Sequence, residues 1–194
     1  MNHVKLSILI CTVSCRKYFL DRILSLIEPQ LVDGVEIIVD ADDAKVLGTK
    51  RNDMMQQAKG DYIVFVDDDD LVPAYYVKET MKALETNPDC TGFKGIRTAK
   101  SKDPKIFIHS NAYTEWFEDV NYFYRTPNHW NAVKKELAIK AGFPDTNWGE
   151  DAEYSKRLKP LLKTSVFIDK IMYYYLADGE LSIASKRYRE KRNK

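Results

Sequence analysis

The sequence is poor in the residues that build disulfide frameworks and zinc sites. It contains three cysteines and three histidines among 194 residues. Cys11, Cys15 and Cys90 are an odd set without the paired spacing of a zinc site, so we expect neither a disulfide scaffold nor structural zinc. Cys11 lies in an apolar run, where a thiol packs as a small hydrophobic group. This usage is typical of a reducing compartment, and we expect a cytoplasmic location.

Long hydrophobic segments are also missing. No apolar run approaches the roughly 20 residues of a transmembrane helix, and Met1–Lys5 leads directly into a strand-like run instead of a signal peptide. We therefore expect no transmembrane segment. Internal repeats, low-complexity segments and linkers are absent too, so we expect a single domain over residues 1–185.

An excess of one charge is found only at the C-terminal end. The formal net charge is +1, but residues 186–194 hold six basic side chains and one acid, Glu190. Such a tail can lie on the phosphates of nucleic acid or of a membrane surface. The simpler alternative is a solvated end that keeps the protein in solution.

Apolar runs alternate with helical patterns in the first half of the chain. Three runs rich in β-branched residues predict strands buried on both faces, at Leu6–Val13, Val35–Val39 and Tyr62–Val66. A pattern of helical spacing follows each, at Lys17–Leu31, Thr49–Ala58 and Ala74–Glu85. This alternation predicts an α/β fold with a mainly parallel, Rossmann-like central sheet flanked by helices.

The second half is less regular. Four strands are predicted, at Gly92–Ile96, Ile106–His109, Tyr122–Arg125 and Val166–Leu176. Two helices are predicted, at Val133–Ala141 and Glu150–Leu162. These elements indicate a smaller mixed sheet.

Polar residues gather where the first three strands end. Thr12 and Val13 end the first run, Asp40 follows the second, and Asp67–Asp70 follow the third. Ligands of open α/β sheets bind at the carboxyl ends of the strands, so we expect these residues to line one crevice.

Four adjacent carboxylates repel one another unless a cation offsets them. Mg²⁺ and Mn²⁺ prefer one or two carboxylates together with phosphate oxygens. The run Asp67–Asp70 therefore predicts a metal site for a phosphorylated ligand. A helix N-cap at Asp70 is the alternative, but it accounts for one aspartate of the four.

Four segments together resemble family 2 glycosyltransferases with the GT-A fold. They are SILICTV, VEIIVD, GTKRNDMMQQAKGDYIVFVDDDD and AGFPDTNWGEDAEYSKRL, in the order of that family. The resemblance implies an enzyme, a hexosyl- or pentosyltransferase that takes a UDP- or GDP-sugar as donor and Mn²⁺ or Mg²⁺ as cofactor. It also implies a nucleotide-sugar half at residues 1–100 and an acceptor half at residues 101–185.

The resemblance also implies roles for particular residues. The expected donor-binding residues are Thr12, Val13, Asp40, Lys50, Arg51, Asp67 and Asp68. Asp67 and Asp69 are the expected metal ligands of a DxD motif, with the register inside the run open by one residue. Asp151 is the expected general base of an inverting transfer, and Trp148, Glu150 and His129 are expected on the acceptor side. Helix N-terminal acids that complement the dipole are the alternative for Glu150 and Asp151.

The sequence departs from that family pattern in one respect. Many metal-dependent members carry a late histidine in the metal shell, and no histidine follows His129 here. The metal would then rest on aspartate, diphosphate and water, or Asp178 would take part. For His129, the alternative to a place on the acceptor side is a purely structural role.

Other functions remain open from the residues alone. Asp68–Val72 also fits the DxDxV motif of haloacid-dehalogenase-like phosphatases, although that motif is normally on the first strand. Nucleotidyltransferases usually begin with a glycine-rich loop, which is missing after Val13. A non-enzymatic sugar- or nucleic-acid-binding module is a further alternative. Within the transferase hypothesis, the acceptor is a glycan precursor or hydroxymethylated viral DNA, in a bacterial or virus-infected cell.

Overall fold

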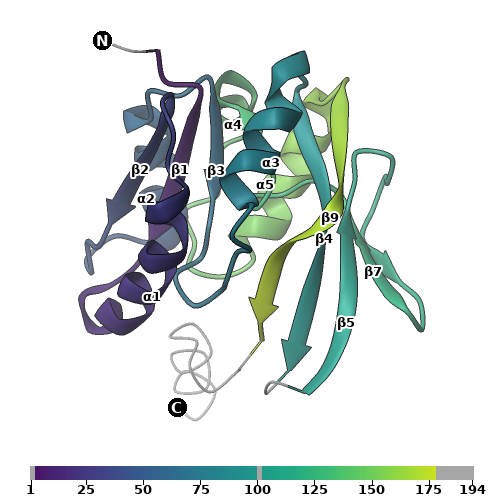
Figure 1. Ribbon diagram of the computed structural model, residues 1–194, viewed down its shortest axis with the longest axis horizontal. Coiled ribbons are helices and arrows are strands. Elements are labelled where there is room, and N and C mark those ends of the chain that lie inside the picture. The colour runs from purple at the N-terminus through teal and green to yellow at the C-terminus, as the bar shows by residue number, and fades with distance from the viewer. Residues whose placement is uncertain (1–2, 100–101, 178–194) are drawn as a thin grey trace.

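The computed structural model describes residues 3–99 and 102–177 (Figure 1). The basic segment 186–194 and Asp178, which the sequence singled out, lie outside the described residues. No helix in the described part of the chain has the length and hydropathy that a bilayer span requires.

Three parallel strands form the first half of the sheet. β1 (Leu6–Cys11) lies between β2 (Val35–Asp40) and β3 (Tyr62–Phe65), and pairs in parallel with both. Nearly every side chain of β1 and β3 is buried, as their continuous apolar runs predict. Because the three strands are parallel, they end at the same edge of the sheet, and the loops that follow them meet there.

The remaining strands extend the same sheet as a mixed region. The order is β2-β1-β3-β8-β4-β5-β7-β6, with β9 paired to β4. These strands are β4 (Cys90–Ala99), β5 (Lys102–His109), β6 (Phe117–Glu118), β7 (Tyr122–Arg125), β8 (Val133–Lys134) and β9 (Ser165–Leu176). β8 is antiparallel to β3 and joins the two regions. The long β4 and β9 run parallel, and in Figure 1 both point downward to the right of β3.

Helices cover both faces of the sheet. The helices are α1 (Lys17–Ile27), α2 (Leu47–Gln57), α3 (Tyr76–Ala83), α4 (Lys135–Ala141) and α5 (Glu150–Leu158). Alternate residues of β1 and β3 point to two separate cores. Ile8 and Val64 pack with α1 and α3, whereas Leu9 and Phe65 pack with α2, α4 and α5. The result is a three-layer α/β/α arrangement (Figure 1).

The predicted elements are present, with differences at their ends. Residues 133 and 134, predicted as the start of a helix, form β8 because their backbone pairs with β3. The short β6 was not predicted. The helix predicted to reach Leu162 ends at Leu158, where Lys159–Leu161 form a 3-10 turn that contains Pro160.

Candidate active site

Asp67 lies just beyond the end of β3 and accepts hydrogen bonds on both oxygens. Arg51 Nη2 donates to Oδ1 at 3.1 Å, and Trp130 Nε1 donates to Oδ2 at 2.9 Å. His129 Nε2 lies 3.2 Å from the same Oδ2. Burial opposes ionisation, but the charges of His129 and Arg51 and these hydrogen bonds hold the pKa of Asp67 below its usual range. Asp67 is therefore a carboxylate at neutral pH.

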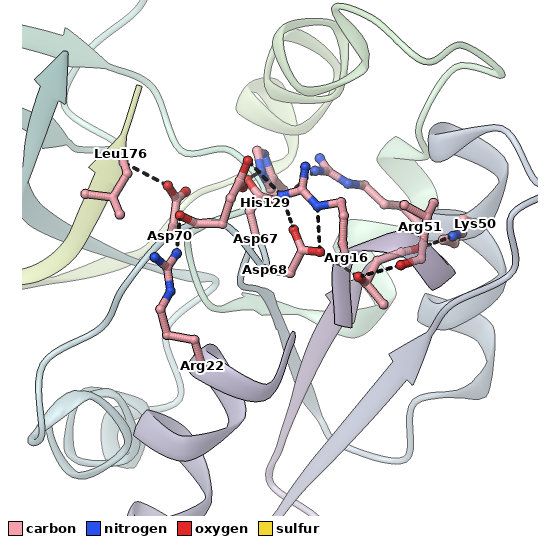
Figure 2. Close-up of polar contacts among 12 residues, drawn as sticks. Arg16, Arg22, Lys50, Arg51, Asp67, Asp68, Asp70, His129 and Leu176 are labelled. Carbon is pink, nitrogen blue, oxygen red and sulfur yellow. Dashed lines mark hydrogen bonds and ion pairs between the residues drawn. The ribbon is translucent and has the colours of Figure 1, made fainter. Parts of the chain in front are cut away.

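Asp68 is bound within the protein. Arg16 donates to it twice, from Nε to Oδ2 at 2.9 Å and from Nη2 to Oδ1 at 2.6 Å, as Figure 2 shows. Thr12 Oγ1 donates to Oδ2 at 2.6 Å. Asp68 is 4% exposed and Arg16 is 9% exposed. The carboxylate of Asp68 is thus occupied by a buried ion pair instead of facing a ligand.

Asp70 is also turned inward, whereas Asp69 is not. Asp70 is fully buried and accepts the Leu176 amide at 2.9 Å. Burial, with the nearby charges of Asp67 and Asp69, raises the pKa of Asp70 well above its usual value. The Asp69 side chain is 28% exposed and its Oδ2 pairs with Arg16 Nη2 at 2.8 Å.

Exposure therefore alternates along the acidic run. The Asp67 and Asp69 side chains are 25% and 28% exposed, and Asp68 and Asp70 are buried. This alternation favours the register Asp67-x-Asp69 for a DxD motif over the register that begins at Asp68.

The ends of β1 and β2 meet beside this run. The Thr12 amide donates to the Asp40 carbonyl at 2.9 Å, and Val13 precedes a 3-10 turn at Ser14–Arg16. Lys50 Nζ donates to the Thr12 carbonyl at 2.6 Å and lies 4.0 Å from Asp40 Oδ1. Lys50 is 2% exposed. It joins α2 to the ends of both strands.

Arg51 joins the donor side to the start of α5. Its guanidinium is 3% exposed and pairs with Asp67 and, through Nη1, with Glu150 Oε1 at 3.4 Å. Gly149 precedes α5 with a left-handed φ of +71°, a conformation that favours glycine. Glu150 is buried against Arg51, and Asp151 follows it in the first turn, half-buried.

Trp148 and His129 lie in different places relative to the acidic run. Trp148 is 62% exposed in the segment before α5. His129, expected on the acceptor side, lies against the donor-side carboxylate of Asp67 and is 3% exposed. The chain therefore places a histidine beside the acidic run from a segment before α4.

Sequence reasoning missed three residues of this site. Arg16 pairs with Asp68, Trp130 donates to Asp67, and the Tyr173 hydroxyl accepts the Asp67 amide at 3.0 Å. The adjacency of Trp130 to His129 is the one signal that pointed to this segment.

The residues present fit a divalent cation that a nucleotide diphosphate helps to hold. Among residues 3–99 and 102–177, no three His, Cys, Asp or Glu side chains form a ready metal cluster. Mg²⁺ and Mn²⁺ sites for nucleotides need only one or two carboxylates, with phosphate and water completing the shell. Asp69 provides a partly exposed carboxylate, and its Arg16 contact involves one oxygen of the two. Asp67, two residues before Asp69, is also partly exposed, and its oxygens accept hydrogen bonds from Arg51 and Trp130.

The family follows from a comparison with known sequences. Glycosyl transferase family 2 matches residues 33–143, which is more than half of the chain. The chain belongs to glycosyl transferase family 2, and the family predicted from its motifs is confirmed. The match includes the acidic run and ends before Asp151. A search of curated proteins gave no match.

Solved structures support the GT-A fold. The chain is similar to S. aureus TarS in complex with UDP-GlcNAc, with a TM-score of 0.67, 15% identity and coverage of 89% of this chain and 58% of that one. It is similar to the mannosyltransferase PcManGT from Pyrobaculum calidifontis in complex with GDP-Man and Mn²⁺, with a TM-score of 0.60, 13% identity and coverage of 88% and 56%. GalNAc-T7 with UDP, GalNAc and Mn²⁺ has a TM-score of 0.51, 14% identity and coverage of 90% and 44%. The chain thus spans little more than half the length of PcManGT and of the TarS fragment 1–349 used in that complex, and 37% of the longer TarS structure.

Proposed function

We propose that the chain transfers a sugar from a nucleotide-diphosphate sugar to an acceptor hydroxyl, with inversion at the anomeric carbon. The observation that carries this proposal is the alternation in the acidic run. It leaves the side chains of Asp67 and Asp69 partly exposed at the ends of β1, β2 and β3 and buries those of Asp68 and Asp70.

The donor side is built from strand ends. Thr12, Val13 and Asp40 lie at these ends, and we assign the nucleobase to Asp40, whose carboxylate also accepts the Asp42 amide and Lys45 Nζ. The side chains of Lys50 and Arg51 are buried, so their positive charges act on the donor from inside the protein. The UDP-GlcNAc bound by TarS and the GDP-Man bound by PcManGT make UDP- and GDP-sugars the donors to test.

Asp69, with Asp67 beside it, would hold Mn²⁺ or Mg²⁺. When bound, the ion offsets the negative charge that develops on the departing nucleotide diphosphate. The Mn²⁺ in the PcManGT and GalNAc-T7 structures supports testing manganese first.

Asp151 is proposed as the general base. It takes the proton from the acceptor hydroxyl while that oxygen bonds to the anomeric carbon, and the bond to the diphosphate breaks on the opposite face. One displacement of this kind inverts the configuration. Trp148, exposed just before α5, is suited to contact the acceptor. A glycan precursor is the proposed acceptor; the basic segment that motivated a DNA acceptor lies outside the described residues.

The phosphatase alternative does not fit the site. Its nucleophile would be Asp68, whose two oxygens accept hydrogen bonds from Arg16 and Thr12 in a buried position. The motif also follows the third strand of the chain. An aspartate held in this way and 4% exposed is not open to a substrate.

A donor screen tests the proposed function. Purified protein is incubated with UDP- and GDP-sugars and Mn²⁺ or Mg²⁺, and released nucleotide diphosphate is measured with and without candidate glycans. We expect one donor to be consumed, and chelation by EDTA to stop the release. Asp151→Asn should abolish transfer and leave binding of UDP or GDP with Mn²⁺ intact. Asp33→Asn, an exposed carboxylate, is the matched control. Release that persists undiminished in Asp151→Asn would remove Asp151 from the role of base.

A further inference from the structure

Helix α2 contacts both the strand ends and the segment that precedes α5. On the donor side, Lys50 holds the Thr12 carbonyl and Arg51 pairs with Asp67. On the other side, Asn52 exchanges two hydrogen bonds with the backbone of Phe143, each of 2.9 Å. One rigid helix therefore fixes the strand ends and the segment that leads to Asp151.

The segment between Phe143 and α5 is docked on the N-terminal turn of α2. The Leu47 amide donates to Asn147 Oδ1 at 2.8 Å, and the Gly48 amide donates to the Thr146 carbonyl at 3.1 Å. The contact is so close that a Cβ at Gly48 would lie 1.8 Å from the Pro144 carbonyl oxygen. Only glycine permits this approach.

Arg51 is the charged centre of this link. Its guanidinium lies beside the edge-to-face pair of Phe65 and Phe143, at 5.4 and 5.3 Å from their ring centroids. Nη2 reaches Asp67 at 3.1 Å and Nη1 reaches Glu150 at 3.4 Å. Only a planar, forked cation places two nitrogens in this way; an ammonium group is a single point charge. At 3% exposure, Arg51 is buried and not on the protein surface.

We propose that Arg51 is a positioning residue that sets the place of Asp151 relative to the donor carboxylate Asp67, and that it is not a ligand of the donor diphosphate. The proposal rests on the proposed function for its assignment of Asp67 and Asp151. The same buried cation balances Asp67 on one element and Glu150, the neighbour of Asp151, on another. A displacement of about 1 Å in a reacting group is enough to lower turnover on the order of a hundredfold.

The first test separates nucleotide binding from turnover. Arg51→Gln, Arg51→Lys and Asn52→Ala are compared with Gln56→Ala, an exposed position on the same helix. Calorimetry gives the Kd of UDP and of GDP with Mn²⁺, and released diphosphate gives kcat with the donor selected by the screen. We expect both Arg51 variants to lose at least about tenfold in kcat while Kd changes less than about threefold. A Kd that weakens in step with kcat would make Arg51 a donor ligand and overturn the proposal.

A double-mutant cycle then asks whether Arg51 acts through Asp151. In an Asp151→Asn background, Arg51→Gln should slow the remaining turnover by less than about threefold, because the residue that it positions is already disabled. Full additivity of the two losses would contradict the proposal.

Hydrogen exchange gives a readout that does not depend on catalysis. UDP with Mn²⁺ should slow amide exchange over residues 150–154 in the wild type and in Gln56→Ala, and should fail to do so in Arg51→Gln. Equal slowing in Arg51→Gln would overturn the link.

Two outcomes need separate treatment. If the wild type binds neither nucleotide and releases no diphosphate, the proposed function fails. Faster exchange over residues 144–153 in unliganded Arg51→Gln would still support the mechanical link, and unchanged exchange would refute it.

If Arg51→Gln does not fold, Asn52→Ala and Gly48→Ala replace it in the test. Both disturb the contacts of residues 143–149 with α2 and leave every charge in place. They should show the same loss of kcat at nearly constant Kd, and unaltered kcat would count against the proposal.

Discussion

The parallel and mixed regions of the sheet differ in what they bury. β1 and β3 are buried at nearly every position, with helices on both faces. β7 is half-buried throughout and β6 is exposed. The parallel region therefore forms a rigid backing that holds the crevice residues at one edge, and the mixed region presents aromatic side chains at its outer end. Phe117, 45% exposed, stacks on Tyr124 with centroids 4.5 Å apart.

The two regions also treat charge differently. The parallel edge holds buried ion pairs, such as Arg16 with Asp68. In the mixed region, the pair of Lys94 with Asp169 lies at the surface, where the Asp169 side chain is 74% exposed. Buried pairs are costly to break, and exposed pairs contribute little. Perturbations at the parallel edge should consequently have larger effects than those at the outer strands.

The largest effect is expected at Arg16. Arg16→Met leaves Asp68 buried without its cation and should lower the free energy of unfolding by about 3–5 kcal/mol. Urea denaturation measures it. Arg157→Met, which breaks the exposed pair with Glu153, is the matched control and should cost less than about 1 kcal/mol. A second change, Asp68→Asn, should recover part of the loss; no recovery would mean that the pair is not the cause.

Asp69 should affect catalysis more than folding. Asp69→Asn removes the partly exposed carboxylate proposed for the metal, and turnover with Mn²⁺ should fall at least about a hundredfold. Binding of Mn²⁺ with UDP or GDP, measured by calorimetry, should weaken in parallel. Glu118→Gln, on exposed β6, should leave both quantities unchanged. Equal activity of the two variants would erase the functional contrast between the regions.

His109 makes the mixed region sensitive to acid. Its burial lowers its pKa to about 3, although Asn131 hydrogen-bonds to the ring. As the pH falls below about 6.5, the unfolded chain binds a proton that the folded chain refuses, so stability decreases. His109→Gln should reduce the slope of unfolding free energy against pH by about 1.4 kcal/mol per unit between about pH 6 and 4. An unchanged slope in urea denaturation series would assign the acid sensitivity elsewhere.

The smallest effect is expected at the outer aromatic stack. Phe117→Ala removes an exposed ring from Tyr124 and should cost about 1 kcal/mol of stability. The Kd of UDP or GDP with Mn²⁺ should not change, because β6 is remote in the sheet order from β1 and β3. Weaker nucleotide binding would show that the mixed region contributes to the donor site.

The sequence predicts the parallel region better than the mixed one for a physical reason. A strand covered on both faces needs a continuous apolar run, and Leu6–Val13 and Tyr62–Val66 are such runs. β8 has two residues, too few to show any periodicity, and its place depends on pairing with β3. The family and the fold were predictable; the long parallel pairing of β4 with β9 was not.

Within the site, local pattern located the carboxylates but not their partners. Four consecutive aspartates give no sign of which ones turn inward. The answer depends on Arg16, 52 positions before Asp68, and on Trp130, 63 positions after Asp67. Such contacts come from tertiary packing, and no spacing in the chain encodes them. The roles of Asp67, Asp69 and Asp151 stay predictions until the variants are measured.

The last described strand, β9, is hydrogen-bonded to the acidic run and to Leu71 after it. Tyr173 accepts the Asp67 amide, the Leu176 amide donates to Asp70, and Leu71 and Tyr174 form a backbone bridge. The first two contacts each join residues 106 positions apart. Contacts so distant along the chain form late, after the loop between them has closed. On the ribosome, the carboxylates would therefore emerge early and stay unassembled until β9 is made, so a chain interrupted before Ser165 would carry the motif without a working crevice.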